Sequence, residues 1–223
     1  MLDRTSFLDA TFGKVSFGEA ILRQTVLLNS DLTQASFTGS VFEGTIFVGS
    51  KLGAQNFSGQ TLRHCQFIDA DLAGADFSGA DLVQCNFKGA NLVDAKMPGV
   101  KADGALFVEA KLTRLNLKGS SVRQALFNGA DLSEADLSNS GLYQSQFART
   151  ICRGSRFVDS DLTYVDFSHA DLRGAIFTRA RLDHAKLHRI TAEAAQWDGA
   201  NRGLAYGNDA ELAEAEDWLK RKK

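Results

Sequence analysis

The sequence predicts an all-β solenoid built from short sides, followed by a short C-terminal α-helix. Three observations predict it. Large apolar residues recur every five positions, small residues stand two positions before them, and glycines stand two positions after them. The stretch CQFIDADLAGADFSGADLVQC, from Cys65 to Cys85, contains all three features.

The column of large apolar residues runs from Leu2 to Trp197 in steps of five, without an insertion or a deletion. All 16 phenylalanines fall on this register, and most of the other positions are leucine. Five residues turn an α-helix by about 500°, and a strand alternates its faces with every residue. Neither element would keep this column on one side, so we expect the chain to turn between successive large residues.

The small residues, such as Ala70, Ala75 and Ala80, show where each side lies. Positions two apart on a strand face the same way, so each small residue and the large residue after it both point inward. The two remaining residues must form a corner. Fourteen of the 20 glycines stand there, where a positive φ suits them. Alternate large residues form a leucine-rich and a phenylalanine-rich set, which predicts an even number of sides per coil.

The motif A(D/N)LxxADF, seen as ADLAGADFSGADL at 70–82 and as ADLSEADL at 130–137, resembles the pentapeptide repeat proteins. The resemblance covers about residues 2–199. It implies a right-handed quadrilateral β-helix with four repeats in each coil, and hence about ten coils. With neighbouring coils about 4.8 Å apart, the rod would be about 48 Å long. We expect residues 1–199 to form this β-helix and residues 200–223 to form a linker and a capping helix.

Composition narrows the class of protein. The formal net charge of −2 argues against a chain that binds nucleic acid directly through a basic surface. Three cysteines without a CxxC pair suit a reducing compartment. No signal-peptide pattern and no long apolar run is present. We therefore expect a soluble, cytoplasmic protein of bacterial type with no membrane partner.

Residues that could take part in catalysis or bind a metal are scattered along the chain. Cys65 and Cys85 would lie one coil apart, which permits a disulfide but favours two buried thiols. There is no glycine-rich phosphate loop and no nucleophile elbow. We expect a protein that is not an enzyme and has no cofactor or metal. The histidines are expected at the surface without partners: His64, His169 and His184 at corners, and His188 at an outward position.

Apolar outward residues gather on one predicted side of the rod, with two more around the neighbouring corner. A contiguous patch of this kind usually marks a binding surface, although β-branched residues also simply suit an exposed sheet. Lys88 interrupts the side. We predict a protein interface here, which could serve either a heterologous partner or a homodimer. Its residues are Leu8, Ile21, Val26, Leu28, Val41, Ile46, Val48, Ile68, Leu106, Val108 and Leu126.

The main functional hypothesis is a non-catalytic rigid scaffold for protein–protein contact. One alternative comes from the resemblance, because some pentapeptide repeat proteins bind DNA gyrase as mimics of duplex DNA. That activity requires a sustained negative face. Aspartate before the large residue is ordinary repeat chemistry, so Asp76 and Asp81 do not establish such a face. Charges also alternate along the column Asp31, Lys51, Asp71, Asn91, Lys111 and Asp131, which weakens the case for such a face.

A second alternative is an accessory or effector of a secretion system.

The five-residue repeat ends before the last segment, where Leu212, Ala215, Trp218 and Leu219 form an apolar stripe on a predicted helix. The simplest role for this helix is to cover the open C-terminal end of the solenoid. Dimerisation through the helix, which occurs in some family members, is the alternative. The first coil has no cap of its own. Its free edge invites pairing, and another chain could provide the cap.

Overall fold

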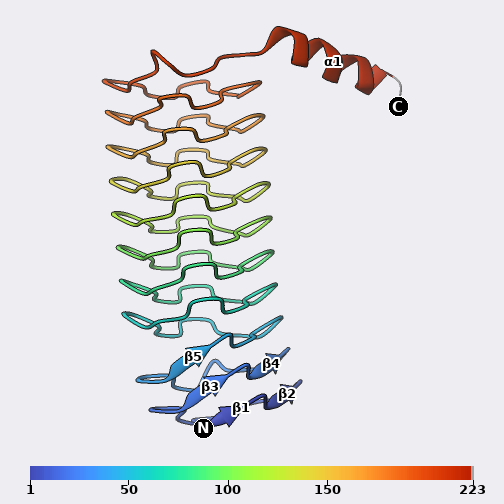
Figure 1. The fold of residues 1–223 in the computed structure, drawn as a ribbon, viewed down its shortest axis with the longest axis vertical. Coiled ribbons are helices and arrows are strands. Elements are labelled where there is room, and N and C mark those ends of the chain that lie inside the picture. The colour runs from blue at the N-terminus through green and yellow to red at the C-terminus, as the bar shows by residue number, and fades with distance from the viewer. Residues whose placement is uncertain (222–223) are drawn as a thin grey trace.

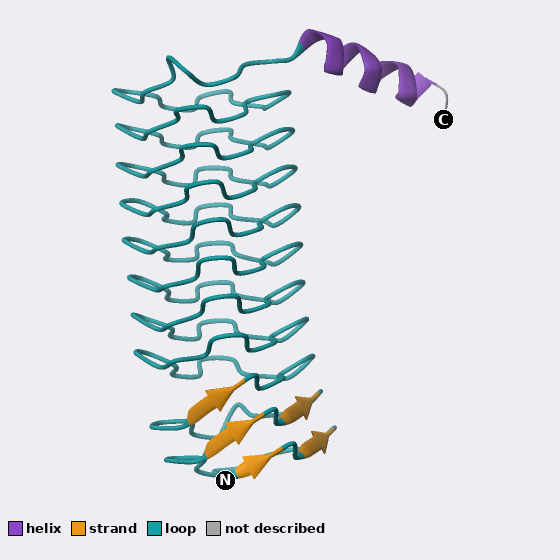
Figure 2. Cartoon of the chain, in the orientation of Figure 1, coloured by secondary structure: helices purple, strands orange, loops and turns teal. Residues whose placement is uncertain are grey.

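The computed structural model describes residues 1–221, which form a long rod of stacked coils with one helix at its C-terminal end (Figure 1). Five short strands lie in the first coils (Figure 2). Among the described residues, no helix is both long enough and apolar enough to cross a membrane. The elements are β1 (Leu2–Asp3), β2 (Ser6–Leu8), β3 (Ile21–Arg23), β4 (Val26–Leu28), β5 (Val41–Glu43) and α1 (Ala210–Arg221).

Parallel pairing between residues twenty apart holds the coils together. Strands β1, β3 and β5 form one sheet, and β2 and β4 form another. Beyond β5 the pairing continues as isolated bridges, such as Asn56 with Asp76 and Thr61 with Asp81. Bridges recur every five residues along the chain, so each coil has four sides. This register confirms the predicted twenty-residue coil.

The ladder of bridges extends beyond the predicted boundary at residue 199. Its last bridge joins Lys186 to Tyr206, so the backbone continues the solenoid after the apolar column has ended. At the next position of that column stands Arg202, whose guanidinium lies 4.8 Å from the centre of the Trp197 ring. The cation can cover one face of the indole ring, so a polar side chain covers the last large apolar residue of the column.

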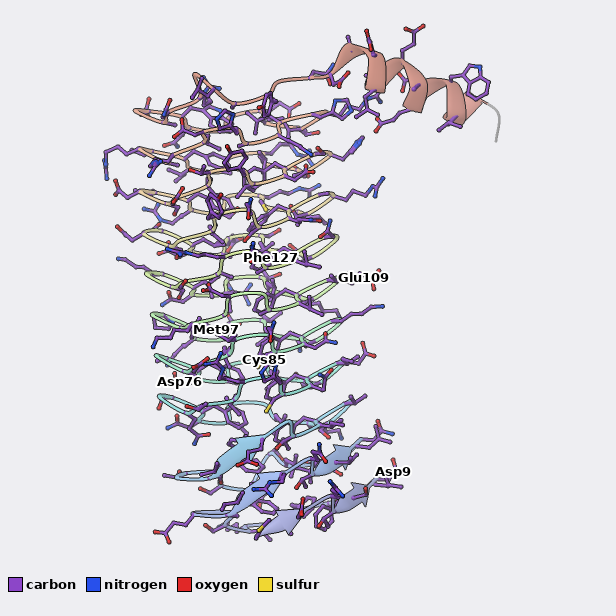
Figure 3. All side chains as sticks on the ribbon, in the orientation of Figure 1. Asp9, Asp76, Cys85, Met97, Glu109 and Phe127 are labelled. Carbon is purple, nitrogen blue, oxygen red and sulfur yellow. The ribbon has the colours of Figure 1, made fainter. Side chains whose placement is uncertain are left out.

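The core is a stack of rings along the rod. Phe87 lies between Phe67 and Phe107, with ring centroids 5.0 and 5.1 Å apart and planes within 3° of parallel. The opposite side stacks Phe57 on Phe77. These contacts confirm the prediction that like residues stack on like. Figure 3 labels three side chains of the fully buried interior: Cys85, Met97 and Phe127.

Most corners are four-residue turns with a positive φ at the third residue. In one of them, the Ala75 N–H donates to the Leu72 carbonyl at 3.0 Å, and Gly74 has a φ of +67°. A positive φ at this position is the mark of a type II turn. Glycine is not required there, since His64 and Tyr164 adopt a similar φ at equivalent corners.

Buried hydroxyls replace some of the direct turn bonds. Ser145 Oγ accepts a hydrogen bond from the Ala125 N–H at 3.2 Å and donates to the Val122 carbonyl at 2.6 Å. It therefore bridges the two backbone groups that would otherwise pair with each other. Because both groups are satisfied, a polar residue can occupy the small inward column without a buried unpaired group.

Many aspartates serve the turns. Asp76, which lies at an edge of the rod (Figure 3), accepts a hydrogen bond from the Ser78 N–H at 2.8 Å and another from the Ser78 hydroxyl. These hydrogen bonds from Ser78 lower the pKa of Asp76 below its usual value. Asp131 bonds Ser133 in the same way. The ordinary repeat role expected for aspartate at this position is therefore seen in the structure.

The lowered pKa of Asp76 predicts acid sensitivity. A carboxylate whose pKa is lower in the folded than in the unfolded state stabilises the fold above about pH 4, and this contribution is lost as the pH falls further. Asparagine performs the same task at Asn86, whose Oδ1 accepts from the Lys88 N–H at 3.0 Å. We expect Asp76→Asn to change the melting temperature little at pH 7. Melting curves between pH 2 and 7 should show that the variant loses less stability in acid than the wild type.

All three cysteines are free and buried. Cys85 Sγ donates to the Leu62 carbonyl at 2.8 Å, one coil below. Burial raises the pKa of the Cys65 and Cys152 thiols to about 12. The expectation of buried thiols instead of a disulfide agrees with this structure, and the raised pKa values make these thiols poor nucleophiles.

Candidate interaction surfaces and the junction of the C-terminal helix

The predicted apolar side begins as a continuous surface. Leu8 of β2 pairs in register with Leu28 of β4, and Val26 forms a bridge with Ile46. Leu8 is 60% exposed, and the others are partly exposed. We call this surface the N-terminal patch. It consists of Leu8, Val26, Leu28, Ile46, Val48 and Ile68.

The N-terminal patch is shorter than the predicted apolar side of the rod. Gln66 forms a bridge with both Ile46 and Asn86, so amides occupy the column after Ile46. The Asn86 side chain donates to Gln66 Oε1 at 3.3 Å. With Lys88 beside them, these residues separate the patch from a second, smaller apolar group. That group consists of Leu106, Val108 and Leu126.

Ile21 and Val41 lie on the neighbouring side, where they pair between β3 and β5. The ion pair between Arg23 Nε and Glu43 Oε2, at 2.7 Å, occupies the corner between this side and the patch. The expected extension of the apolar surface around the corner is therefore interrupted by charge. The two residues form a separate exposed pair.

Helix α1 does not lie across the end of the solenoid, as its predicted role as a cap requires. It projects sideways from the last coil (Figure 1). The exposed fractions of the expected cap residues Leu212, Trp218 and Leu219 are 47%, 53% and 58%, and Ala215 is also exposed. A polar residue of the helix is bonded to the rod, and Leu212 and Leu219 line shallow hollows on either side of it, next to His188 and His169.

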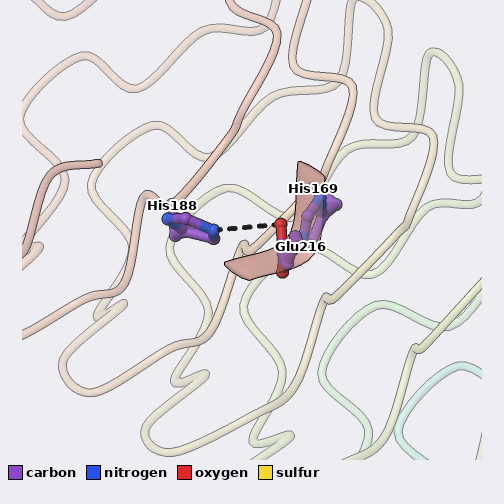
Figure 4. A group of neighbouring side chains, drawn as sticks. All are labelled: His169, His188 and Glu216. Carbon is purple, nitrogen blue, oxygen red and sulfur yellow. Dashed lines mark hydrogen bonds and ion pairs between the residues drawn. The ribbon is translucent and has the colours of Figure 1, made fainter. Parts of the chain in front are cut away.

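That polar residue is Glu216, which lies between two histidines from successive coils (Figure 4). Glu216 Oε1 is 3.0 Å from His169 Nε2, and Oε2 is 3.4 Å from His188 Nε2. His188 is only 4% exposed. Burial pushes the pKa of Glu216 upward, but the hydrogen bonds from the two histidines outweigh it and leave the pKa lowered.

Arg189 completes what we call the polar junction, which comprises His169, His188, Arg189 and Glu216. Arg189 Nε is 3.1 Å from Glu216 Oε2, and its Nη2 is 2.8 Å from Asp217 Oδ2. The same Nη2 donates to the Ala213 carbonyl. One arginine of the last coil therefore holds the helix through two carboxylates and the backbone.

The expectation that the histidines lie at the surface without partners is wrong for His169, His184 and His188. The His184 Nδ1 atom lies 3.1 Å from the Tyr206 hydroxyl, and its ring stacks on that of Tyr164. No spacing in the sequence indicates the junction, because Glu216 follows the two histidines only after the repeat has ended. The signal that could have found it is His188, an outward residue on one of the last sides of the solenoid before helix α1 begins at Ala210.

Two imidazoles and a carboxylate within 4.8 Å of one another resemble a zinc ligand set. The hydrogen bonds of His188 indicate instead that the ring nitrogen facing Glu216 carries a proton. His188 Nδ1 accepts from the Asp209 N–H at 3.1 Å, so the proton of a neutral ring lies on Nε2, the atom that faces Glu216. A protonated nitrogen has no lone pair for a metal. The nearby Arg189 cation also disfavours a second positive charge.

We therefore expect Zn²⁺ to leave the thermal unfolding temperature of the protein unchanged at neutral pH. Differential scanning calorimetry with added Zn²⁺ and with a chelator tests this. A rise in the unfolding temperature that His169→Gln abolishes would show instead that the junction binds metal.

Carboxylates elsewhere on the rod are often paired with arginine. Arg114 binds Asp94 through two hydrogen bonds at 2.6 and 2.7 Å. Asp171 receives both Arg153 and Arg173, and their hydrogen bonds hold its pKa well below the usual range. Such pairing neutralises negative charge locally, which a mimic of the DNA backbone would need to avoid.

Comparison with models of known protein families identifies the family of this chain. The family model of pentapeptide repeats matches eight copies, which together cover residues 16–53 and 56–179. The chain belongs to the pentapeptide repeat family. Its members fold as right-handed quadrilateral β-helices, and the four-sided coils found here have that architecture.

Solved structures of pentapeptide repeat proteins also match this chain. HetL from the cyanobacterium Nostoc sp., described as involved in heterocyst differentiation regulation, is 24% identical with a TM-score of 0.73. The match covers 94% of this chain and 92% of HetL. At this identity the likeness shows the fold alone.

Two further structures match less closely. A trypsin-treated variant of QnrB1, a plasmid-mediated fluoroquinolone resistance protein, is 17% identical over 97% of this chain and 95% of its own, with a TM-score of 0.45. Rfr23 from the cyanobacterium Cyanothece is 21% identical over 42% and 64%, with a TM-score of 0.41. Comparison with curated proteins finds no match.

Proposed function

We propose that this pentapeptide repeat protein is a non-catalytic scaffold that binds another protein chain through the N-terminal patch. The carrying observation is the concentration of apolar, solvent-accessible side chains on one side of the first four coils. Leu8, Leu28 and Val48 follow one another directly in the parallel register. The outward columns immediately beside it are polar instead: Asp3, Arg23 and Glu43 before it, and Thr11, Asp31 and Lys51 after it.

The core supports this role because it presents the patch on a continuous backbone ladder. Each side of a coil donates hydrogen bonds to the coils above and below it, as Ile46 does to Thr25 and Leu27 does to Ile46. A surface built on such a ladder loses little conformational entropy when a partner binds. Apolar contacts then contribute about 25 cal/mol per Å² of buried area.

Double substitution of the patch tests the proposal. Ile46→Asp with Val48→Asp should abolish binding, measured as solution mass by light scattering across a concentration series and by cross-linking to partner proteins. Asn56→Asp with Thr61→Asp is the matched control, since it adds the same charge on two other sides of the rod, where Asp76 and Asp81 already occur one coil above. If every complex survives the patch substitution in a folded protein, the proposal is wrong.

A DNA-mimicking protein that binds gyrase is the second candidate, and it depends on the family alone. The paired carboxylates at Asp94 and Asp171 do not favour it. Gyrase supercoiling assays with and without quinolone separate the two candidates. An unchanged assay at micromolar protein would remove the mimic, whereas inhibition or protection that survives the patch substitution would favour it.

A further inference from the structure

A groove runs along one side of the last coils and ends beside helix α1. It consists of two adjoining hollows, which share Asp166 and Lys186. Leu126 and Gln146 also line the first hollow, and Leu212 of the helix lines the second. The groove therefore begins at the smaller apolar group of the rod and is separate from the N-terminal patch, which lies on the first coils.

One wall of the groove is a row of aromatic rings. Tyr164 lines the first hollow and is 47% exposed, and Tyr206 lines the second and is 56% exposed. His184 connects them, because its ring stacks on Tyr164 with centroids 4.8 Å apart and its Nδ1 lies 3.1 Å from the Tyr206 hydroxyl. Rings held in place by one another lose little conformational freedom when a ligand binds.

The two exposed tyrosines lie two coil spacings apart along the rod. Successive bridges join Asp166 to Lys186 and Lys186 to Tyr206, and Tyr164 stands two residues before Asp166. Two spacings of about 4.8 Å separate the rings by about 9.6 Å along the axis. A polyproline II helix has three residues per turn and a rise of about 3.1 Å, so it repeats every 9.3 Å or so. Every third residue of such a helix would therefore meet a tyrosine.

The polar groups that remain free in the groove are mainly hydrogen-bond donors. Gln144 Oε1 accepts from the Gln124 side chain at 3.0 Å, which leaves the NH₂ group of Gln144 to donate. The Asp166 carboxylate is already engaged by the Ser168 N–H at 2.8 Å and by Lys186 Nζ at 3.8 Å. A ligand that suits this groove accepts hydrogen bonds and donates few.

We propose that the groove binds a proline-rich segment of a partner protein in the polyproline II conformation. Proline has no N–H, and the carbonyls of this helix have no internal partners, so the segment offers acceptors to the donors of the groove. Proline-rich segments commonly dock in grooves lined by aromatic residues. The groove is a second binding site of the protein, in addition to the N-terminal patch.

The charges of the groove also favour an uncharged ligand. Asp166 and Lys186 have opposite signs and pair with each other. Asp209, at the end of the groove, caps helix α1 by accepting a hydrogen bond from the Leu212 N–H at 2.9 Å. No charge in the groove is left to select a strongly acidic or basic segment, whereas a run of prolines is neutral.

An oligosaccharide, another uncharged ligand, fits the groove less well. Sugar hydroxyls donate hydrogen bonds as well as accept them, and the Asp166 carboxylate is already engaged. His184 also covers one face of the Tyr164 ring, with 14° between the two planes, so that face is closed to a stacking sugar. Proline rings can instead pack against the exposed ends of Tyr164 and Tyr206.

Fluorescence anisotropy of labelled decaproline tests the proposal with the full-length protein. We expect saturable binding, which Tyr164→Ala and Tyr206→Ala each weaken by roughly tenfold or more, as the loss of an aromatic anchor usually does. Tyr164→Phe keeps the ring and should retain most of the affinity. Ile151→Ala, which shortens an exposed apolar residue on another side of the rod, is the matched control and should leave binding unchanged. Absence of saturable binding to the wild type overturns the proposal.

Two further peptides test the spacing of the rings. A peptide with proline at every third position and alanine between should bind roughly tenfold more tightly than one with as many prolines at every fourth position, because only the first presents successive prolines on one face of the helix. Equal affinities would contradict recognition of a polyproline II helix. Binding of cellohexaose in place of decaproline would show that the groove is a sugar site instead.

The patch variant Ile46→Asp with Val48→Asp distinguishes this site from the one in the proposed function. It should bind decaproline as the wild type does, since the N-terminal patch lies on other coils. Weaker decaproline binding by this variant, in a folded protein, would show that the groove is not a separate site. Partner binding that depends on Ile46 and Val48 but survives Tyr164→Ala would leave the proposed function standing even if decaproline does not bind.

Discussion

Replacing Phe87 with alanine is expected to lower the free energy of unfolding by about 3–5 kcal/mol, the usual cost of deleting a fully buried ring. Phe87 stacks between Phe67 and Phe107, so the substitution removes two ring contacts and leaves a cavity in the middle of the rod. Neighbouring coils cannot collapse into the cavity, because backbone hydrogen bonds keep them apart at the spacing of paired strands. Urea unfolding followed by circular dichroism measures the change.

Two matched variants make this expectation specific. Phe7 occupies the same column in the first coil but is only partly buried, so Phe7→Ala should cost less than Phe87→Ala. Phe87→Leu should cost about 1 kcal/mol, since leucine already stands in this column at Leu27 and Leu187. Equal losses for Phe7→Ala and Phe87→Ala would show that the stack of rings does not account for the stability.

Replacing Glu216 with alanine is expected to release helix α1 from the rod. The substitution removes the acceptor of both His169 and His188 and one of the two carboxylates that hold Arg189. Hydrogen bonds to charged groups are stronger than neutral ones, and the buried His188 would lose its side-chain hydrogen bond to Glu216. Amide hydrogen exchange in residues 210–221 should become faster by roughly tenfold or more.

Glu214→Ala is the matched control, because Glu214 is an exposed residue of the same helix outside the polar junction. It changes the charge of the helix by the same amount and should leave the exchange rates nearly unchanged. Faster exchange in both variants would mean that helix propensity or charge, and not the polar junction, determines how firmly α1 is held. Exchange in the central coils should stay the same in both proteins.

The solenoid could be predicted from the sequence because its physical signals are local and repeated. Each five-residue unit contains one large inward residue, one small inward residue and one turn. A shift of the register by one residue would turn the apolar residues outward. The stacks of Phe67 on Phe87 and of Phe57 on Phe77 follow directly from the alternation of leucine and phenylalanine. The four sides themselves came from the family resemblance.

The interaction surfaces were predicted less completely. The outward columns placed Leu8, Val26 and Leu28 together correctly, because their neighbours lie twenty residues apart. The same columns contain the break at Gln66 and Asn86, which the predicted interface did not include. The ion pair of Arg23 with Glu43 depends on side-chain direction at a corner, which spacing alone does not give.

By itself, the sequence determined the five-residue register and the inward residues of the core, since every side repeats the same choice of inward residue and these choices reinforce one another. Only the tertiary structure decided where the C-terminal helix lies. Its apolar stripe predicted a cap, but Glu216 meets two histidines and Arg189 on the last coils, and these polar contacts hold it beside the rod. The helix occurs once, so no repetition reveals its partners. Its position follows from contacts between residues far apart in the chain.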